Sequence, residues 1–258
     1  MGIPDNREVT AFVGFVFNGE HSIEDHKIYR TSDGSRYAEN LIPTTMDKTA
    51  DVPGGNGQYF FKTNYKNRQI AIPIAFDQLN KEEFYNLKKW LKGDSIHELS
   101  FDERPEVKYS AKVTGTPQLK YICFEENGVD IYKGEGSIQF TCYFPFGHTE
   151  AEPWTKTATS TSDLDINESI SVGGDIDTTF VFETTGVVGE VEIGNLKINP
   201  SETSFTWNSS TGLVVNTDGT PIAYIGKSYG LIGPDDINLK FTIKRNCTAT
   251  LSWKKLYL

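Results

Sequence analysis

Apolar and polar residues alternate with a period of two along much of the first 145 positions of the chain. Four runs show the pattern, and their apolar members are Val9, Ala11, Val13, Phe15 and Phe17; Ile70, Ile72, Ile74 and Phe76; Val107, Tyr109, Ala111 and Val113; and Ile138, Phe140, Cys142 and Phe144. Successive side chains of a strand point to opposite faces of a sheet, so each run predicts a strand with one buried face. The pairs Asn18-Gly19 and Asn127-Gly128 predict tight hairpin turns.

Pro73 interrupts the second of these runs. Proline has no backbone N–H to donate to a neighbouring strand, and it is therefore found mainly in edge strands or at bulges. The sequence thus predicts that the strand over residues 70–76 lies at an edge of its sheet or carries a bulge.

Residues 79–93 have the period of a helix instead of a strand. Asn80 can cap the first turn, and Glu83 three residues later completes a capping box. Gly93 is placed to end the helix. The apolar stripe that this helix would pack on the sheet is Phe84, Leu87 and Leu91.

The composition changes between residues 149 and 162, where Thr, Ser and Pro replace the alternating pattern. This change predicts a linker between a domain of residues 1–148 and a second domain of residues 163–250. The last strand, near residues 251–258, is a candidate to complete the first domain. Short alternating runs separated by Gly and Asn turns predict a sandwich for the second domain. Their apolar members are Phe180 and Phe182; Val191 and Ile193; Phe205 and Trp207; Leu239, Phe241 and Ile243; and Ala249, Leu251 and Trp253.

The net charge of −10 argues against a nucleic-acid-binding protein, because a chain of that sign repels phosphate backbones. No basic stretch is followed by an apolar run at the N-terminus, and no apolar segment has the length of a membrane span. We therefore expect a soluble protein that is made in a cytoplasm and does not contact a membrane.

Candidate chemistry is sparse along the chain. The histidines are scattered at positions 21, 26, 97 and 148, and we expect His21 and His26 to be solvated in a polar loop. Adjacent acidic residues in a strand face opposite sides, so the acidic doublets do not form a catalytic pair. Cys123, Cys142 and Cys247 are too few and too widely spaced for a disulfide framework or a zinc site, and Cys142 is expected in the core. These patterns predict no enzyme, no metal and no cofactor.

Three separated segments resemble the distal tail protein family of siphophages. They are residues 51–91, the stretch HELSFDERPEVKYSAKVTG and the stretch GEGSIQFTCYFP. The positions that fit the family pattern in order are Leu99, Phe101, Asp102, Pro105, Tyr109, Ala111, Val113, Gly115, Phe140, Cys142 and Pro145. The second half resembles the galectin-like module often appended in that family, although Asp235 stands in LIGPDDINLKF where the module has glycine.

This resemblance implies a mainly β chain, with an N-terminal β-sandwich-like ring domain that has one helix and a long hairpin, and a C-terminal galectin-like β-sandwich. It implies a structural virion protein, made in the host cytoplasm, that forms a homo-hexameric ring at the distal end of a long non-contractile tail. Such a hub links the major tail-tube protein to a tail-associated lysin or spike and holds baseplate or receptor-binding proteins. DNA passes through the lumen of the ring without specific binding.

A ring needs a heterologous interface that closes on itself, and strand addition at an open edge is one way to make it. The candidate ring-interface residues are Ile70, Ile72, Ile74 and Phe76 of the expected edge strand, and Asn127 and Gly128 of the hairpin over residues 121–136. In the second domain the loop 227–236 is the candidate for holding other tail parts, with Lys227, Asp235 and Asp236 as candidate rim residues.

The tryptophans of the second half leave an alternative from another class of function. A carbohydrate-binding protein could act in host adsorption by stacking sugar rings on Trp154, Trp207 or Trp253. Trp207 and Trp253 alternate in phase with Phe205 and Leu251, however, which predicts that both are core residues. We therefore expect a C-terminal domain without sugar affinity.

Overall fold

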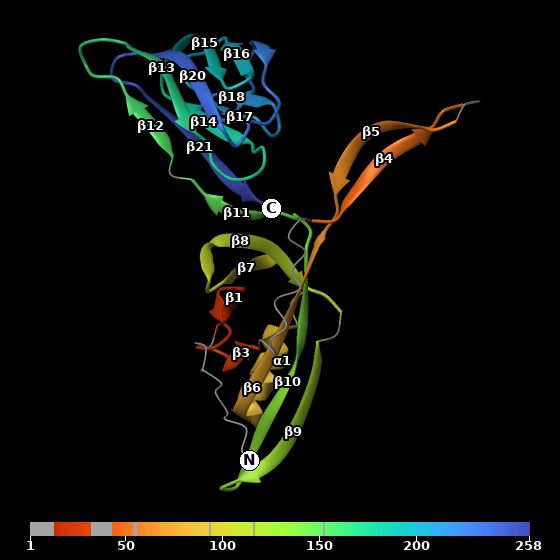
Figure 1. Cartoon of the computed structure of the whole chain (residues 1–258). Coiled ribbons are helices and arrows are strands. Elements are labelled where there is room, and N and C mark those ends of the chain that lie inside the picture. The colour runs from red at the N-terminus through yellow and green to blue at the C-terminus, as the bar shows by residue number, and fades with distance from the viewer. Residues whose placement is uncertain (1–12, 32–42, 54–55, 93, 116, 152) are drawn as a thin grey trace, which may run out of the picture. The chain divides into compact units, whose positions relative to one another are not determined.

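The computed structural model describes residues 13–31, 43–53, 56–92, 94–115, 117–151 and 153–258 (Figure 1). The chain forms two compact units, Met1–Gly147 together with Leu258, and His148–Tyr257. Strand β11 (Gly147–Glu150) lies where the two units join in sequence. Both units are built almost wholly of antiparallel strands, so the predicted mainly β fold is confirmed.

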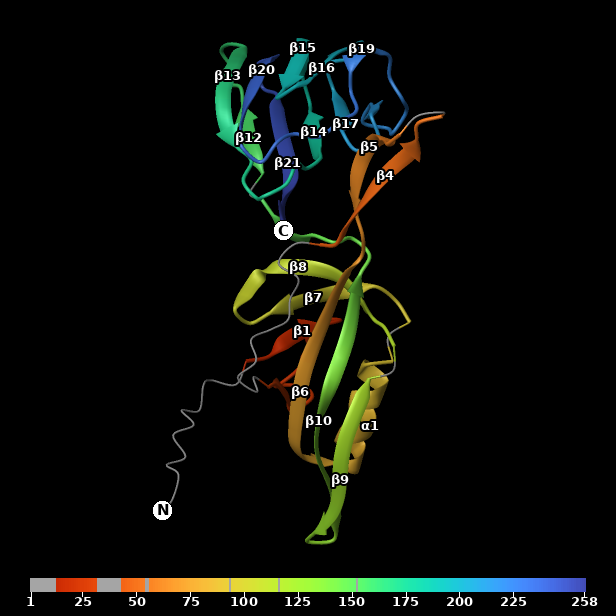
Figure 2. The same ribbon diagram turned by 45° about the vertical axis from the view of Figure 1, so that its right-hand side comes forward.

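An antiparallel sheet forms the body of the N-terminal unit (Figure 2). Its strands are β1 (Phe15–Phe17), β2 (Glu20–His21), β3 (Ile28–Arg30), β6 (Arg68–Asn80), β7 (His97–Phe101), β8 (Arg104–Val113), β9 (Gln118–Glu126) and β10 (Val129–Cys142). Strand β10 is central, because β6 pairs with one of its edges while β9 and then β8 pair with the other. Strand β8 continues to β7 and β1, and β3 flanks β6.

The alternating runs supply the core of this unit as predicted. The apolar residues of 107–113 and of 138–142, Cys142 among them, are buried, and so are Phe15 and Phe17 of β1. Phe144 is an exception, since it lies beyond the end of β10 and is exposed. Val9 and Ala11 lie outside the described residues.

Both predicted Asn-Gly turns are confirmed. Asn18 and Gly19 have φ of 55° and 77°, and Asn127 and Gly128 have φ of 52° and 79°. Positive φ at both central residues is the geometry of a two-residue type I′ turn, whose twist matches that of the flanking strands. The first turn joins β1 to β2, and the second joins β9 to β10.

Strand β6 is not an edge strand. It pairs with β10 from Arg68 to Asn80 and with β3 at residues 74–76. The carbonyl of Pro73 accepts a hydrogen bond from the Thr31 N–H on the side away from β10. The N–H and C=O of a strand residue point to the same side, so the donor that proline lacks is missing on that side and the β10 ladder at Pro73 is intact. The edge alternative for residues 70–76 is therefore wrong, whereas β6 does carry a register shift just beyond Phe76.

The predicted helix is confirmed as α1 (Lys81–Trp90), the one helix in the described part of the chain. The Asn80 side chain accepts a hydrogen bond from the Glu83 N–H at 2.9 Å, and the Glu83 carboxylate accepts one from the Asn80 N–H at 2.8 Å. Gly93 lies outside the described residues. The buried side chains are Phe84, Leu87, Trp90 and Leu91, and only Trp90 was absent from the predicted stripe. No described helix is long and apolar enough to cross a membrane.

Trp90 fixes the end of the helix against the first strand. Its Nε1–H donates to the Phe17 carbonyl oxygen at 3.1 Å, and its ring stacks on Phe15 at 5.8 Å between centroids. The His26 ring also stacks on the Trp90 ring, with 4.1 Å between centroids, and His26 Nε2 lies 2.6 Å from a Glu20 carboxylate oxygen. His26 is only 8% exposed, so the expectation that it is solvated is wrong.

The capping carboxylate also pairs with a lysine. Lys27 donates a hydrogen bond to Glu83. Burial alone would raise the pKa of the Glu83 carboxyl, but the hydrogen bond from Lys27, the Asn80 N–H and the charge of Lys27 together hold the pKa below its ordinary value of 4.5.

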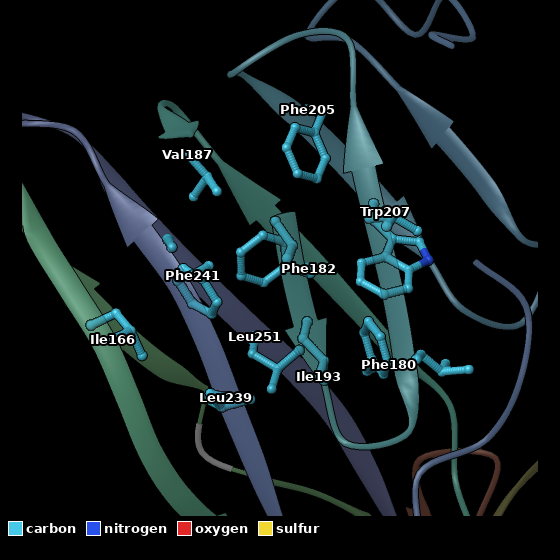
Figure 3. Packing of buried hydrophobic residues seen from close by; sticks show 14 of the residues in the cluster. Ile166, Phe180, Phe182, Val187, Ile193, Phe205, Trp207, Leu239, Phe241 and Leu251 are labelled. Atoms are coloured by element: carbon cyan, nitrogen blue, oxygen red, sulfur yellow. The ribbon is translucent and has the colours of Figure 1, made fainter. Parts of the chain in front are cut away.

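The C-terminal unit is a sandwich of two antiparallel sheets. One has the order β13 (Leu164–Ser171), β20 (Asp236–Ile243), β15 (Val187–Ile193), β16 (Leu196–Pro200) and β19 (Tyr224–Lys227). The other has the order β12 (Trp154–Thr157), β21 (Thr248–Tyr257), β14 (Phe180–Thr184), β17 (Phe205–Asn208) and β18 (Leu213–Val215). Their inner faces meet in one apolar core (Figure 3).

Two of the predicted boundaries need correction. The predicted linker over 149–162 contains β12, which pairs with β21, and Ala158, which is buried in the sandwich core. The last strand, predicted near 251–258 as a candidate to complete the N-terminal domain, is β21 of the C-terminal unit, where Leu251 and Trp253 are core residues. Threonine-rich composition indicated a linker, but β-branched residues also suit a strand at the border of a sheet.

Substitution of the helix stripe tests how α1 is held. Leu87→Ala and Leu91→Ala should each lower the free energy of unfolding by about 2–4 kcal/mol, because both side chains are buried and leave cavities. Tyr85→Ala is the matched control, since Tyr85 is 70% exposed on the same helix, and it should change stability by less than about 0.5 kcal/mol. Urea denaturation measures all three, and unchanged midpoints for both leucine variants would contradict the packing described above.

The capping pair should make stability depend on pH. A carboxyl whose pKa is lowered on folding contributes stability that is present above its unfolded pKa and is lost as the pH falls through its folded pKa. Glu83→Gln should therefore destabilise the protein at pH 7, and the difference from the parent chain should shrink as the pH falls below about 4. Thermal melts across this range measure it, with Glu82→Gln as the control from the same turn. A difference independent of pH would show that the charge of Glu83 is not involved.

Candidate interaction surfaces

A two-stranded arm, β4 (Thr45–Asp51) and β5 (Gln58–Tyr65), stands away from the sheet of its own unit (Figures 1 and 2). Its aromatic residues are in water: Tyr59, Phe60 and Phe61 are 56%, 62% and 60% exposed. Nothing in the sequence analysis predicted this arm. The available signal was a run of three aromatic residues beside a glycine-rich turn, and such a run lacks the alternation that marks a half-buried strand.

A second surface is the outer part of the β9–β10 hairpin, which we call the ribbon (residues 118–137). Ile122 and Phe124 lie on one face of β9, and Val129 and Ile131 lie on the same face of β10, because Phe124 is opposite Ile131 in the register. Ile122, Phe124 and Val129 are each at least 40% exposed. The ribbon therefore presents an apolar patch to solvent on one face near its tip.

The opposite face of the ribbon rests on the helix. The Phe84 ring stacks on Tyr132 at 4.5 Å and meets Tyr121 at 4.8 Å. Desolvation raises the pKa of Tyr132, with further increases from its hydrogen bond with Cys123 and from the charge of Asp130. One face of the ribbon is thus used for packing within the unit, while the other is left free.

The predicted ring-interface residues fall into two groups. Ile70, Ile72, Ile74 and Phe76 are at most 5% exposed, so they belong to the core and cannot offer side chains to a partner. Asn127 and Gly128 form the exposed tip of the ribbon. The prediction included the hairpin over residues 121–136 but did not single out its exposed apolar side chains, and it missed the arm.

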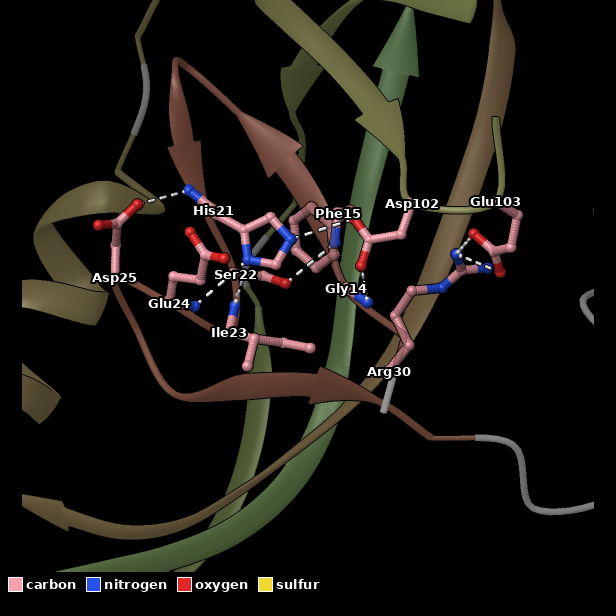
Figure 4. Close-up of polar contacts among 10 residues, drawn as sticks. All are labelled: Gly14, Phe15, His21, Ser22, Ile23, Glu24, Asp25, Arg30, Asp102 and Glu103. Atoms are coloured by element: carbon pink, nitrogen blue, oxygen red, sulfur yellow. Dashed lines mark hydrogen bonds and ion pairs between the residues drawn. The ribbon is translucent and has the colours of Figure 1, made fainter. Parts of the chain in front are cut away.

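A polar cluster joins the β1–β2 hairpin to the β7–β8 turn (Figure 4). Asp102 accepts a hydrogen bond from the Gly14 N–H at 2.6 Å and lies 3.1 Å from His21 Nε2. His21 Nδ1 accepts bonds from the N–H groups of Ile23 and Glu24, so Nε2 carries the ring proton that faces Asp102. His21 is held by these contacts, contrary to the expectation that it is solvated.

This cluster has the residue types of a hydrolase but not the arrangement. Ser22 is fully buried, and its Oγ accepts a hydrogen bond from the Phe15 N–H at 3.0 Å, so it is not a nucleophile that the histidine could activate. Gly14 leaves no room for a side chain, because a Cβ there would lie 2.9 Å from His21. Arg30 and Glu103 complete the cluster, where Arg30 Nη1 donates to both carboxylate oxygens of Glu103 at 2.9 and 2.7 Å. The contacts tie two turns together.

No metal site is present in the described residues, where no three His, Cys, Asp or Glu side chains are placed to share an ion. The three cysteines are free.

In the C-terminal unit the predicted rim residues bracket an apolar loop. Lys227 ends the edge strand β19, while Asp235 and Asp236 are exposed where β20 begins. Ile225, just before Lys227 in β19, is 80% exposed, and Tyr229, between Lys227 and Asp235, is 66% exposed. The predicted charges are therefore accompanied by large apolar side chains that the sequence analysis did not single out.

Hydrogen bonds hold this loop in place. Trp207 Nε1–H donates to the Ser228 carbonyl oxygen at 2.7 Å. The Ser228 hydroxyl bonds to the Gly212 carbonyl oxygen at 2.9 Å and to the Tyr224 hydroxyl at 2.6 Å. The backbone between the exposed residues on either side of Ser228 is thus hydrogen-bonded to the core of the unit.

Two of the tryptophans named by the carbohydrate-binding alternative are core residues, as their phase predicted. Trp207 is fully buried, and Trp253 is 8% exposed with its Nε1–H bonded to the Val172 carbonyl oxygen. Neither offers the open ring face that sugar stacking needs. Trp154 is half-buried and makes a T-shaped contact with Phe241.

Comparison with known proteins gives a match in the N-terminal unit. Residues 24–142 match the family model of the phage tail protein RIFT-related domain. No curated protein matches the sequence.

A solved structure shares the fold over nearly the whole chain. The crystal structure of the Dit (gp 19.1) protein of phage SPP1, described as a paradigm of hub adsorption apparatus in phages infecting Gram-positive bacteria, is similar over 95% of this chain and 99% of that chain, with a TM-score of 0.61 and 12% identity. Two phage P2 baseplate structures, in the activated conformation with Ca and with Sr, cover 94% of this chain and 98% of theirs at 9% and 11% identity. Their TM-scores of 0.40 and 0.41 are too low to carry an argument. The domain match and the shared Dit fold confirm the resemblance to siphophage distal tail proteins.

The exposure of the arm predicts that its aromatic residues do not support the fold. Phe60→Ser with Phe61→Ser should leave the urea midpoint unchanged within about 0.5 kcal/mol and should reduce binding of a hydrophobic dye, because both rings are in water. Phe140→Ser is the contrasting control, since Phe140 is fully buried and its loss should unfold or strongly destabilise the unit. A large loss of stability in the double variant would mean that the arm packs on the body of its unit.

Proposed function

We propose that this chain is a structural hub protein that forms a homo-hexameric ring at the distal end of a long non-contractile phage tail. The observation that carries the proposal is that two hairpins, the arm and the ribbon, expose apolar side chains on a part of the chain that matches a phage tail protein domain. Single exposed apolar residues are common, but contiguous apolar ribbons on a chain of this size mark surfaces that are covered in an assembly.

Two different surfaces are what a ring requires. When one patch of each copy binds a different patch of the next copy, the copies form a ring if the rotation between neighbouring copies divides a full turn. Strand β9 pairs with β10 alone among the described strands, so its outer edge is available for strand addition as well. A stable interface buries about 800 Å² on each partner.

In this role the ring joins the major tail-tube protein on one side to a tail-associated lysin or spike on the other. The C-terminal unit holds baseplate or receptor-binding proteins through the loop between Lys227 and Asp236 and the adjoining strand β19, where Tyr229 and Ile225 are the respective apolar anchors. The protein is a virion component made in the host cytoplasm. DNA crosses the lumen without specific binding, in keeping with the net charge of −10.

A non-enzymatic role agrees with the polar cluster around His21, whose groups are committed to backbone contacts. The buried tryptophans of the C-terminal unit give carbohydrate binding no support as a second function.

Purified full-length protein should form six-fold rings that are visible by negative-stain microscopy, with a mass by light scattering that rises towards six copies as concentration increases. If the ring needs a template, adding the phage's own tail-tube protein should supply it. A protein that remains monomeric at every concentration and does not bind the tail-tube protein would overturn the proposal.

A further inference from the structure

An apolar groove lies between α1 and β9. Its volume is about 340 Å³, and Phe84, Leu91, Pro117, Leu119 and Tyr121 line it. Phe84 and Leu91 form the floor, since both are nearly buried in the unit. Two lysines, Lys88 and Lys92, complete the lining.

The lysines make this groove a positive site on an acidic chain. Lys88, Lys89 and Lys92 fall within five residues at the end of α1. The Lys88 ammonium lies 4.3 Å from the centre of the Phe84 ring, at the groove itself. No carboxylate among the described residues forms an ion pair with Lys88 or Lys92. The nearest acids in sequence are Glu83 for Lys88 and Asp94 for Lys92.

The tip of the ribbon has the complementary character. Glu125, Glu126 and Asp130 surround the Asn-Gly turn, and in the described part of the chain none of them pairs with a lysine or arginine. Alternation along the strands puts Glu126 on the same face as Phe124 and Val129. The tip therefore presents two exposed apolar side chains and a carboxylate together.

We infer that the ribbon tip of one copy of this chain docks in the α1–β9 groove of the next copy. Phe124 and Val129 lie in the apolar groove, Glu126 pairs with Lys88 or Lys92, and Glu125 and Asp130 add to the attraction. This inference rests on the proposed ring and identifies the two surfaces that would close it.

The groove of a copy cannot receive its own tip. Leu119 at the groove and Glu126 at the tip belong to the same straight strand, and seven residues of strand span about 23 Å. The contact must therefore be made between copies. Tip-to-tip contact brings carboxylates together and groove-to-groove contact brings lysines together, so repulsion disfavours both symmetric dimers. Attraction is left to the contact of a tip with a groove, and copies that each give their tip to one neighbour and their groove to another build a ring.

Charge reversal and its rescue test this contact in the full-length protein. Glu125→Lys with Glu126→Lys reverses the tip, and Lys88→Glu with Lys92→Glu reverses the groove. Each pair alone should weaken self-association by about ten-fold or more at low salt, because it turns attraction into repulsion. All four substitutions together should restore association to within about three-fold of the parent chain, because the charges again match. Lys240→Glu with Lys244→Glu, two exposed lysines of the C-terminal unit, is the control for net charge.

The outcomes separate this inference from the proposed ring. If the parent chain forms rings while both reversals associate as well as it does, or if the fourfold variant is as weak as the single reversals, the tip does not meet the groove and the hub proposal stands. A parent chain that never assembles, with or without the tail-tube protein, overturns both.

A covalent test keeps the inference open to refutation if a reversed variant folds poorly. Copies with Glu126→Cys and copies with Lys88→Cys, both in a Cys123→Ser background that removes the exposed thiol of the ribbon, are mixed and mildly oxidised. A disulfide-linked dimer should form in the mixture and be much weaker with either variant alone. Assembled rings without this cross-link would contradict the inference.

Discussion

The long antiparallel ladder between β6 and β10 is the interaction on which the rest of the N-terminal unit depends. It runs from Asn80 and Ile131 at one end to Arg68 and Cys142 at the other. The same strand β10 gives its second edge to β9 and β8 in turn, so one strand joins the ribbon to the body of the sheet. The inward residues of β6 are buried by this ladder, which is why they hold the unit together and are not available to a partner.

Glycine makes the branch in this ladder possible. The register between β6 and β10 shifts near Gly134, where β9 also approaches closely. A Cβ at Gly134 would lie 2.4 Å from the Lys120 carbonyl oxygen, and one at Gly136 would lie 2.2 Å from that of Gln118. Any side chain at these positions would push β9 away, and the ribbon would lose the support that keeps it extended.

The same construction explains why apolar residues remain in water. A ribbon that leaves the body of a sheet has two faces, and the helix covers only one of them through the Phe84 contacts with Tyr121 and Tyr132. Soluble monomers usually protect such ribbons with charge or proline. Here the ribbon tip and the end of α1 carry charges of opposite sign, which favours contact between a tip and a groove and disfavours contact between two tips or two grooves. The polar cluster of His21 and Asp102 serves the fold in a similar way, because it satisfies backbone groups at two turns that the sheet cannot reach.

The local features of this protein were determined by its sequence alone. The two Asn-Gly turns, the capping box of Asn80 and Glu83, and the buried faces of the alternating runs depend on interactions within a few residues or on the simple rule that strand faces alternate. The core positions of Trp207 and Trp253 followed from the same rule. A resemblance of spaced motifs was enough to indicate the tail protein family.

Only the tertiary structure decided which edges are paired and which apolar residues stay exposed. Alternation shows which face of a strand is buried, but it contains no information on which strands lie beside it. Pro73 therefore suggested an edge strand, although β3 pairs with β6 and Thr31 donates a hydrogen bond to the Pro73 carbonyl oxygen. The arm was missed because neither face of this hairpin is buried, so its sequence does not alternate between apolar and polar residues. The threonine-rich segment became part of the sandwich because β21 was there to pair with it. In each case the deciding partner lies far away in the sequence, where local propensity has no influence.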